Sequence, residues 1–262
     1  MNIGERLAYF PSREPFVTPP GVEDVEFASA DGTTLHGWFM PAFDAAPGER
    51  RPVVLHAHGN AGHVGWHAGF SAFLRERGVH VLLFDYRGYG RSDDARQTRR
   101  ALLDDTRAAL ACLRARPDVD ADRIGMYGVS LGGAFALPAA AEDTSVRAVV
   151  TLSAFSTWRG TAHDMLPVVG PMLIHGGLDP EDAAAGLGDR PYLIVHGDED
   201  GVIHVRHAQR LFEAATEAGV TTELVIVPRA DHNTIIDRHA DARDAIGDFF
   251  VEHLGVRSEH DP

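Results

Sequence analysis

The chain has 262 residues, 44% of them hydrophobic, which is enough to bury one sizeable core, and we expect a single domain over residues 1–262. Its 38 acidic residues outnumber the 24 basic ones and give a net charge of -14, so nucleic acids and anionic membrane surfaces are unfavourable partners. Every basic residue is an arginine, which excludes catalysis by a lysine Schiff base or a Ser-Lys dyad.

The first residues of the sequence lack the basic stretch and apolar core of a signal peptide, and no apolar run is long enough to span a bilayer. The only cysteine is Cys112, so an intrachain disulfide is impossible. It falls in residues 101–113, where apolar residues recur at helical spacing, so we expect a packed rather than a reactive thiol. These features predict a cytoplasmic protein without stable membrane insertion.

Two extended stretches between residues 22 and 40 flank Asp31 and Gly32, a dipeptide typical of hairpin turns, and predict an antiparallel edge. Six apolar segments with strand character follow and alternate with helical stretches. These segments are residues 53–56, 79–84, 124–127, 146–152, 192–195 and 224–227. The alternation predicts an α/β fold, a mostly parallel twisted sheet with helices on both faces, whose ligands bind beyond the carboxyl ends of the strands.

A glycine-rich loop with the sequence HGNAG, residues 58–62, follows the first of these strands. It lacks the GK[ST] ending of a phosphate-binding loop, and an ordinary strand-to-helix turn is the alternative to a functional role. In an acyl-transfer enzyme, the backbone N–H of Asn60 would be well placed to bind an oxyanion.

Residues 128–132 spell GVSLG between a short extended segment and a helix-compatible run of small residues. A serine raised above a sheet needs a sharp turn, and glycines on both sides leave room for it. This pattern predicts Ser130 as a nucleophile and the backbone N–H of Leu131 as a second oxyanion donor. Pro138 falls inside the predicted helix that follows, and it should kink that helix or end it early.

The segment 154–190 is the least regular part of the sequence, and its apolar residues are interrupted by prolines. It is expected to form either a short lid over a binding pocket or a core-packing helix broken by prolines. Five side chains in it are candidates to line an acyl pocket, although residues of these types more often belong to a core. They are Phe155, Trp158, Met165, Leu166 and Met172.

A serine nucleophile needs an imidazole to take its proton and a carboxylate to orient that imidazole. Asp198 and Asp200 follow one predicted strand, and Asp231 and His232 follow the next. The carboxyl ends of parallel strands share one edge of a sheet, so these side chains can meet Ser130 there. The order serine, acid, histidine indicates His232 as the base and leaves three aspartates as candidates for the acid.

Pairs of histidines at or near helical spacing occur twice, at His63 and His67 and at His204 and His207. No acidic or cysteine cluster accompanies either pair in the sequence to complete a metal site. We therefore expect neither a metal nor a cofactor.

Together these motifs resemble the α/β-hydrolase family over nearly the whole chain, residues 22–254. The resemblance rests on HGN at residues 58–60, FDYRGYGRS at 84–92, GVSLG at 128–132, HGDED at 196–200 and DHN at 231–233. It implies the α/β-hydrolase fold and favours Asp200, the last residue of the HGxxD run, as the triad acid. It also implies that residues 85–92 form a wall of the pocket and take no part in the chemistry.

The arrangement is most similar to small uncapped serine hydrolases of the BEM-type and serine-aminopeptidase-like branches. The resulting hypothesis is a serine hydrolase that cleaves a small-molecule carboxylic ester or thioester through an acyl-enzyme on Ser130. A peptidase or amidase, or a cofactor-free perhydrolase, would use the same residues. A non-catalytic binding protein on this scaffold is a further alternative, because fold similarity does not decide activity.

Overall fold

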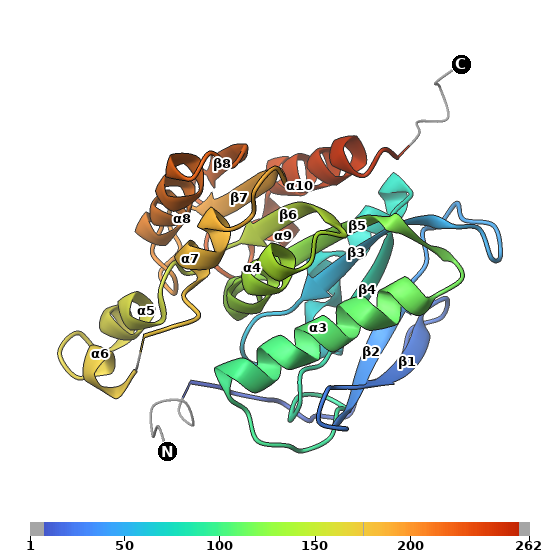
Figure 1. Cartoon of the computed structure of the whole chain (residues 1–262), viewed down its shortest axis with the longest axis horizontal. Helices are drawn as coiled ribbons and strands as arrows, with labels where there is room; N and C mark the ends of the chain where they lie inside the picture. Colours follow the sequence, from blue (N-terminus) through green and yellow to red (C-terminus); the bar gives the residue numbers. More distant parts are fainter. Residues whose placement is uncertain (1–7, 175, 257–262) are drawn as a thin grey trace.

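A single eight-stranded sheet forms the centre of the computed structural model, which describes residues 8–174 and 176–256 (Figure 1). The strand order is β1-β2-β4-β3-β5-β6-β7-β8. β2 is antiparallel to both of its neighbours, and every pair from β4 to β8 is parallel. The prediction of a mostly parallel sheet with an antiparallel N-terminal edge is confirmed.

The strands lie where the apolar segments of the sequence placed them, with small differences at their ends. They are β1 (Glu23–Ala28), β2 (Thr34–Met40), β3 (Arg51–Ala57), β4 (His80–Phe84), β5 (Val119–Val129), β6 (Val146–Leu152), β7 (Tyr192–Gly197) and β8 (Thr222–Val227). β5 is longer than predicted because Val119 already pairs with Arg51 of β3, and a register shift that contains the more polar residues 120–123 separates this pair from the next one, Ile124 with Val53. Such a segment carries no apolar signal, so the sequence pattern detected only the buried second half of the strand.

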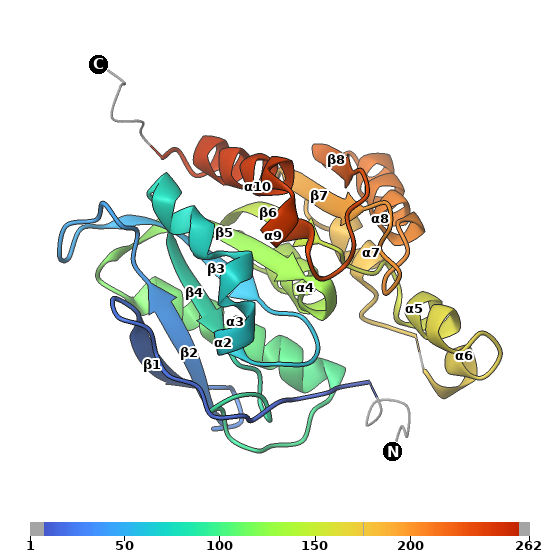
Figure 2. The ribbon, with the colours of Figure 1, turned by 180° about the vertical axis from the view of Figure 1, so that it is seen from behind.

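Helices cover both faces of the sheet, as Figures 1 and 2 show from opposite sides. The helices are α2 (Val64–His67), α3 (Arg99–Ala115), α4 (Gly133–Glu142), α5 (Trp158–Met165), α6 (Gly170–Leu173), α7 (Pro180–Ala185), α8 (Arg206–Glu217), α9 (Ile235–Arg238) and α10 (Ala240–His253), with 3-10 turns η1 (Ala68–Phe70), η2 (Ala72–Arg77) and η3 (Ser130–Gly132). None of the described helices has the length and hydropathy needed to cross a membrane.

The strands from β2 to β8 contribute to two hydrophobic cores, one on each face of the sheet. Along β3, Val53 and Leu55 pack into the core under α3, α4 and α8, whereas Val54 packs into the core under α10. Successive side chains of a strand point to opposite faces, so a strand buried on both faces is apolar throughout. This explains why β3 to β7 read as continuous apolar runs in the sequence.

α4 continues through Pro138, so the expectation that this proline would end the helix early is wrong. Eight consecutive residues of α4, from Gly133 to Ala140, are buried. A proline inside a helix costs about 3 kcal/mol, and burying two large side chains such as Phe135 and Leu137 recovers about that much. Tertiary packing therefore holds this helix together against its local preference.

The irregular segment 154–190 forms α5, α6 and α7. α7 packs against α4 and α8 on the body of the molecule, whereas α5 and α6 project from it as a small helical pair (Figures 1 and 2). α5 begins at a capping residue, Thr157, whose hydroxyl accepts a hydrogen bond from the amide of Gly160 at 3.0 Å. The projecting pair lies at the carboxyl end of the sheet, beside the residues described next.

Candidate active site

Ser130 is the first residue of η3, in the sharp turn directly after β5, and its backbone is in the left-handed region with φ of 52°. A residue with a side chain adopts this conformation only under constraint, and such strain is common at functional sites. A Cβ atom at Gly128 would lie 2.6 Å from the Cα of Gly133, and one at Gly132 would lie 1.8 Å from the carbonyl oxygen of Ala57. Only glycine fits at these two positions, so the GxSxG pattern here has a steric cause.

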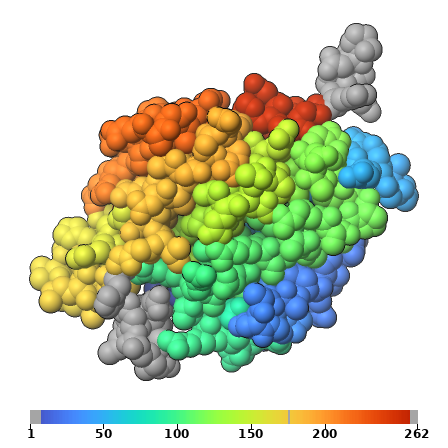
Figure 3. Space-filling model, in the orientation of Figure 1, coloured from blue at the N-terminus to red at the C-terminus, as the bar shows by residue number. Residues whose placement is uncertain are grey.

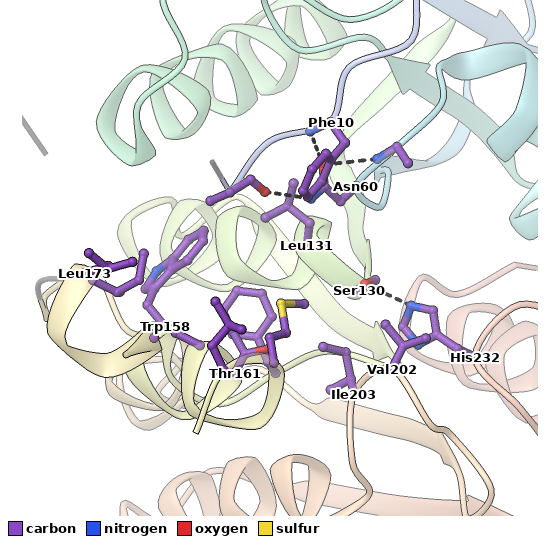
Figure 4. Close-up of a pocket in the computed structure, with 18 of the residues that line it drawn as sticks. Phe10, Asn60, Ser130, Leu131, Trp158, Thr161, Leu173, Val202, Ile203 and His232 are labelled. Carbon is purple, nitrogen blue, oxygen red and sulfur yellow. Dashed lines mark hydrogen bonds between the residues drawn. The ribbon is translucent and has the colours of Figure 1, made fainter. Parts of the chain in front are cut away.

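The side chains of Ser130, His232 and Asp200 form one hydrogen-bonded line, with 3.1 Å between Ser130 Oγ and His232 Nε2 and 2.7 Å between His232 Nδ1 and Asp200 Oδ2. Figure 4 shows the contact between Ser130 and His232 at the edge of a pocket. A carboxylate only accepts hydrogen bonds, so His232 donates from Nδ1. The lone pair on Nε2 of His232 can then accept a hydrogen bond from the hydroxyl of Ser130.

The carboxylate of Asp200 is held in place by backbone amides as well as by the imidazole. Its Oδ1 accepts the backbone amides of Val202 at 2.9 Å and Ile203 at 2.8 Å, and its side chain is fully buried. Burial alone would raise the pKa of this carboxyl, but hydrogen bonds with His196 and His232, and the charge that His232 can carry, hold it below its ordinary value. Asp200 therefore stays a carboxylate at neutral pH.

The other two candidate acids are used elsewhere in their loops. Asp198 accepts the amide of Arg229 at 2.6 Å. Asp231 closes a turn before α9 by accepting both the amide and the hydroxyl of Thr234, at 2.9 and 2.6 Å. Among the three aspartates, the contact with the imidazole falls to Asp200, which the HGxxD run favoured.

A cavity of about 420 Å³ opens beside Ser130. Four of the five predicted pocket residues line it, namely Phe155, Trp158, Met165 and Leu166, and Met172 does not. Phe155 and Trp158 are each 4% exposed and also belong to the core on that face of the sheet. These two aromatic side chains therefore belong to the core and also form part of the cavity wall, so both predictions made for them from the sequence hold.

Sequence reasoning also missed two groups of lining residues outside the segment 154–190, and Figure 4 shows their labelled members Phe10 and Ile203 on opposite sides of the cavity. Ala8 and Phe10 come from the N-terminal segment that crosses the site, and Val202 and Ile203 come from the loop that follows Asp200. The second group was detectable, because apolar residues directly after a candidate catalytic acid lie near the site by necessity. The first group gave no signal, since it precedes every recognisable element.

The side chain of Asn60 is occupied by structural hydrogen bonds. Its Oδ1 accepts the amide of Phe10 at 2.9 Å and the hydroxyl of Tyr89 at 2.8 Å, and its Nδ2 donates to the carbonyl oxygen of Ala8 at 2.7 Å. Asn60 and Leu131 both line the cavity next to Ser130. The side chain of Asn60 thus fixes the loop that carries it.

Residues 85–92 do not form a pocket wall, and that expectation is corrected. No residue of this run is among the described residues that line the cavity. Asp85 is fully buried behind the site, where it accepts the amide of Val64 at 2.8 Å and contacts Nδ1 of His36 at 3.2 Å. The run supports the beginning of α2, directly after the loop that carries Asn60.

Of the paired histidines, His67 has a structural contact and lies beside another buried histidine, His58. His67 Nε2 lies 2.8 Å from the carbonyl oxygen of Ala61, and the ring stacks on His58 at 4.9 Å. Burial lowers the pKa of His58 to about 3 and that of His67 below its ordinary value, so both stay neutral. No group of three described His, Cys, Asp or Glu side chains is arranged to hold a metal.

The cysteine of the sequence, Cys112, is half-buried in the structure, and burial raises the pKa of its thiol.

Comparisons with known proteins agree with this architecture. A model of the prolyl oligopeptidase family matches residues 66–257. The uncharacterized protein YfhR of Escherichia coli strain K12 is 34% identical over 262 residues, which cover 98% of this chain and 90% of YfhR.

Two solved structures show the same fold. The esterase Pf2001 of Pyrococcus furiosus matches 94% of this chain and 100% of its own, with a TM-score of 0.78 and 20% identity. The acylaminoacyl peptidase of Pyrococcus horikoshii matches 92% of this chain and 43% of its own, with a TM-score of 0.73 and 20% identity. At these identities the likeness is one of fold.

Proposed function

Because the chain belongs to the prolyl oligopeptidase family and has the α/β-hydrolase fold, we propose that it is a serine hydrolase that cleaves carboxylic esters or thioesters through an acyl-enzyme. One observation carries the proposal. The hydroxyl of Ser130, held at a strained turn, lies 3.1 Å from an imidazole that is itself 2.7 Å from a buried carboxylate. This is the geometry that nucleophilic serine catalysis requires.

In the proposed reaction, His232 Nε2 takes the proton of Ser130 as Oγ attacks the carbonyl carbon of the substrate. The resulting imidazolium is stabilised by the ionised Asp200. The tetrahedral intermediate collapses, His232 gives the proton to the departing alcohol or thiol, and an ester of Ser130 remains. Water then attacks this ester with the same proton transfers, which releases the acid and restores the serine.

The oxyanion of each tetrahedral intermediate would be bound by the backbone N–H groups of Leu131 and Asn60. Both residues line the cavity beside Ser130, and Leu131 follows Ser130 directly in the helical turn η3. Amides fixed in advance need no reorganisation when the charge develops, and one such donor contributes about 3 kcal/mol. The four hydrogen bonds around the Asn60 side chain would supply that fixed position.

The lining of the cavity supports an uncharged acyl group as the substrate. Among the described lining residues there is no Asp, Glu or Arg, and His232 is the one titratable side chain. A charged substrate group would lose its hydration there without gaining a partner. A cavity of about 420 Å³ with mostly apolar walls suits an acyl chain, and we propose that α5 and α6 act as a short roof over it.

A peptidase is the second candidate, because the family match is to prolyl oligopeptidases and one fold relative is an acylaminoacyl peptidase. The same three residues would serve amide hydrolysis. The uncharged lining weighs against a free peptide terminus as the group bound in the cavity. Rates on an ester and an amide that share one acyl group would separate the two activities.

Replacing Ser130 with alanine tests the proposal. A panel of p-nitrophenyl esters of increasing chain length would be hydrolysed by the wild-type protein, and the Ser130→Ala variant should lose about four or more orders of magnitude in kcat. A fluorophosphonate probe should label the wild-type protein and not the variant. Near-full activity or labelling in the variant would reject the proposal.

A further inference from the structure

Exposed apolar side chains line the opening of the cavity and continue along the connection between α5 and α6 and onto α6, and we call them together the apolar rim. The rim consists of Phe10, Met165, Leu166, Val168, Val169, Met172 and Val202. Val168 is 79% exposed and Met172 is 78% exposed. Most of the large apolar side chains that are exposed in the described part of the chain belong to this rim. Concentrated exposure of this kind is typical of an interaction site.

The rim is carried mainly by the part of the molecule that projects furthest from the sheet. α5, α6 and their connection extend away from the body in both ribbon views, and Figure 3 shows the same segment in yellow at the edge of the molecule. A flat surface that approaches this edge would meet the rim before it met the sheet or its covering helices. The fold thus presents these side chains first.

The rim and the cavity are continuous. Phe10, Met165, Leu166 and Val202 are exposed to solvent and also line the cavity that contains Ser130. A molecule that covers the rim therefore has an uninterrupted apolar path to the nucleophile. This continuity indicates that whatever binds to the rim also supplies the acyl group that enters the cavity.

The charge of the protein indicates which kind of surface the rim can approach. The chain carries a net charge of -14, so an anionic bilayer would repel it. The one acidic side chain near the rim on α5, Asp164, is turned inward, where its side chain is 4% exposed and pairs with Arg206 and with His207. The rim itself is composed of uncharged side chains and suits an uncharged or zwitterionic surface.

We propose that the apolar rim docks on a zwitterionic lipid surface, from which ester-linked acyl chains pass directly into the cavity. The inference rests on the proposed function, because it names the physical form of the substrate for the same site. Binding would be peripheral and reversible, with the tips of α5 and α6 among the acyl chains and the rest of the molecule in water.

The test uses three rim residues that do not line the cavity, replaced together as Val168→Ser, Val169→Ser and Met172→Gln. Binding is measured by co-sedimentation with phosphatidylcholine vesicles, and turnover is measured on a long-chain ester within the vesicles and on soluble p-nitrophenyl butyrate. The triple variant should bind vesicles at least tenfold more weakly and hydrolyse the embedded ester at least tenfold more slowly. Its rate on the soluble ester should stay within twofold of wild type, which also shows that it is folded.

Phe43→Ser provides the matched control. Phe43 is 63% exposed but lies in the connection between β2 and β3, at the opposite end of the molecule from α5 and α6. This variant should bind vesicles and hydrolyse both esters as the wild-type protein does. An equal loss of vesicle binding in Phe43→Ser would contradict a role specific to the rim.

Three results would overturn the inference: no vesicle binding by the wild-type protein, binding only to phosphatidylglycerol vesicles, or a wild-type dimer that the triple variant converts to a monomer. The last would assign the rim to a second copy of the chain. If vesicles are not bound but the soluble ester is hydrolysed through Ser130, the docking surface fails and the proposed function stands. If vesicles are bound but no ester is hydrolysed, the proposed function fails, and acyl delivery fails with it.

Discussion

The carboxylate of Asp200 has both oxygens engaged before any substrate arrives, one by two backbone amides and one by His232. In the isosteric amide, an N–H₂ group that faced the two backbone amides would set donor against donor, so this group turns to the imidazole instead, where it favours the wrong tautomer of His232. We expect Asp200→Asn to lower kcat on a soluble ester by about four orders of magnitude with little effect on stability.

Asp198→Asn is the matched control, since Asp198 is two residues away and contacts the amide of Arg229 instead of the imidazole. It should retain more than about half of the wild-type kcat. An equal loss of activity in the two variants would contradict the assignment of Asp200 as the acid. The sequence left three aspartates as candidates for the acid and favoured Asp200 through the HGxxD run, and the folded positions of the loops show which carboxylate contacts the imidazole.

The steric demand at Gly132 is local and severe, because a Cβ atom there would lie 1.8 Å from a backbone oxygen of β3. A backbone atom of a central strand cannot move aside as a flexible side chain can. Gly132→Ala should therefore lower the free energy of unfolding by about 1–3 kcal/mol or more and strongly reduce esterase activity. Chemical denaturation followed by fluorescence measures the first effect.

Gly69→Ala is the appropriate comparison, because a Cβ atom at Gly69 has no neighbour within 4 Å and lies in a short helical turn. Alanine is favoured over glycine in helical conformations, so this variant should be as stable as wild type or slightly more stable. A Gly132→Ala protein with normal stability and activity would show that the turn at Ser130 can relax.

At the scale of elements, the N-terminal segment is the part of the site that no sequence pattern indicated. It runs beside the loop that carries Asn60, and Pro11 pairs with Gly62 as an isolated bridge. The amide side chain of Asn60 binds the backbone of Ala8 and Phe10 much as a neighbouring strand would. Backbone pairing of this kind depends little on residue type, so periodicity and motifs cannot reveal it.

α5 is tied to α8 by a buried polar contact in which His207 Nε2 lies 3.0 Å from Asp164. The other ring nitrogen, Nδ1, accepts the amide of Ser156 at 3.1 Å and so must keep its lone pair. The charged and titratable groups around the ring are Asp164 on α5, Arg206 and Arg210 on α8, and His196 and His204. Burial, and then these neighbouring positive charges, lower the pKa of His207 to about 4.

This shift predicts a dependence of stability on pH. Between about pH 6.5 and about pH 4, the unfolded chain binds a proton at His207 that the folded protein excludes, so stability falls as the pH falls through this window. In His207→Gln this contribution is absent. The free energy of unfolding should therefore drop between pH 7 and pH 5 by on the order of 2 kcal/mol less in the variant than in wild type. Parallel curves for the two proteins, from denaturation at both pH values, would contradict the neutral state of His207.

Across the whole molecule, the sheet and the three-residue line at its edge were predictable because both follow from short-range rules. Strands buried on two faces read as apolar runs, and the ends of parallel strands bring Ser130, Asp200 and His232 together. The cavity was predictable only in part, since its shape depends on how α5, α6 and the N-terminal segment pack. The cavity is lined by residues about 150 positions apart, such as Phe10 and Met165, and no pattern within a window of sequence encodes that arrangement.

The net charge of -14, with arginine as the only basic residue type, also bears on substrate choice at the scale of the whole molecule. A negatively charged acyl thioester, such as an acyl-coenzyme A, must approach against this field, whereas a neutral thioester with the same acyl group does not. Salt screens the repulsion between the protein and the anionic thioester.

We expect kcat/KM for the anionic thioester to rise about two- to tenfold when ionic strength increases from about 0.01 M to about 0.15 M. The neutral thioester should change by less than about twofold over the same range, because its approach is not opposed by charge. Faster turnover of the anionic thioester at low salt would instead indicate a local cluster of arginines that steers it to the site, and the uncharged lining around Ser130 would then not determine which acyl donors are used.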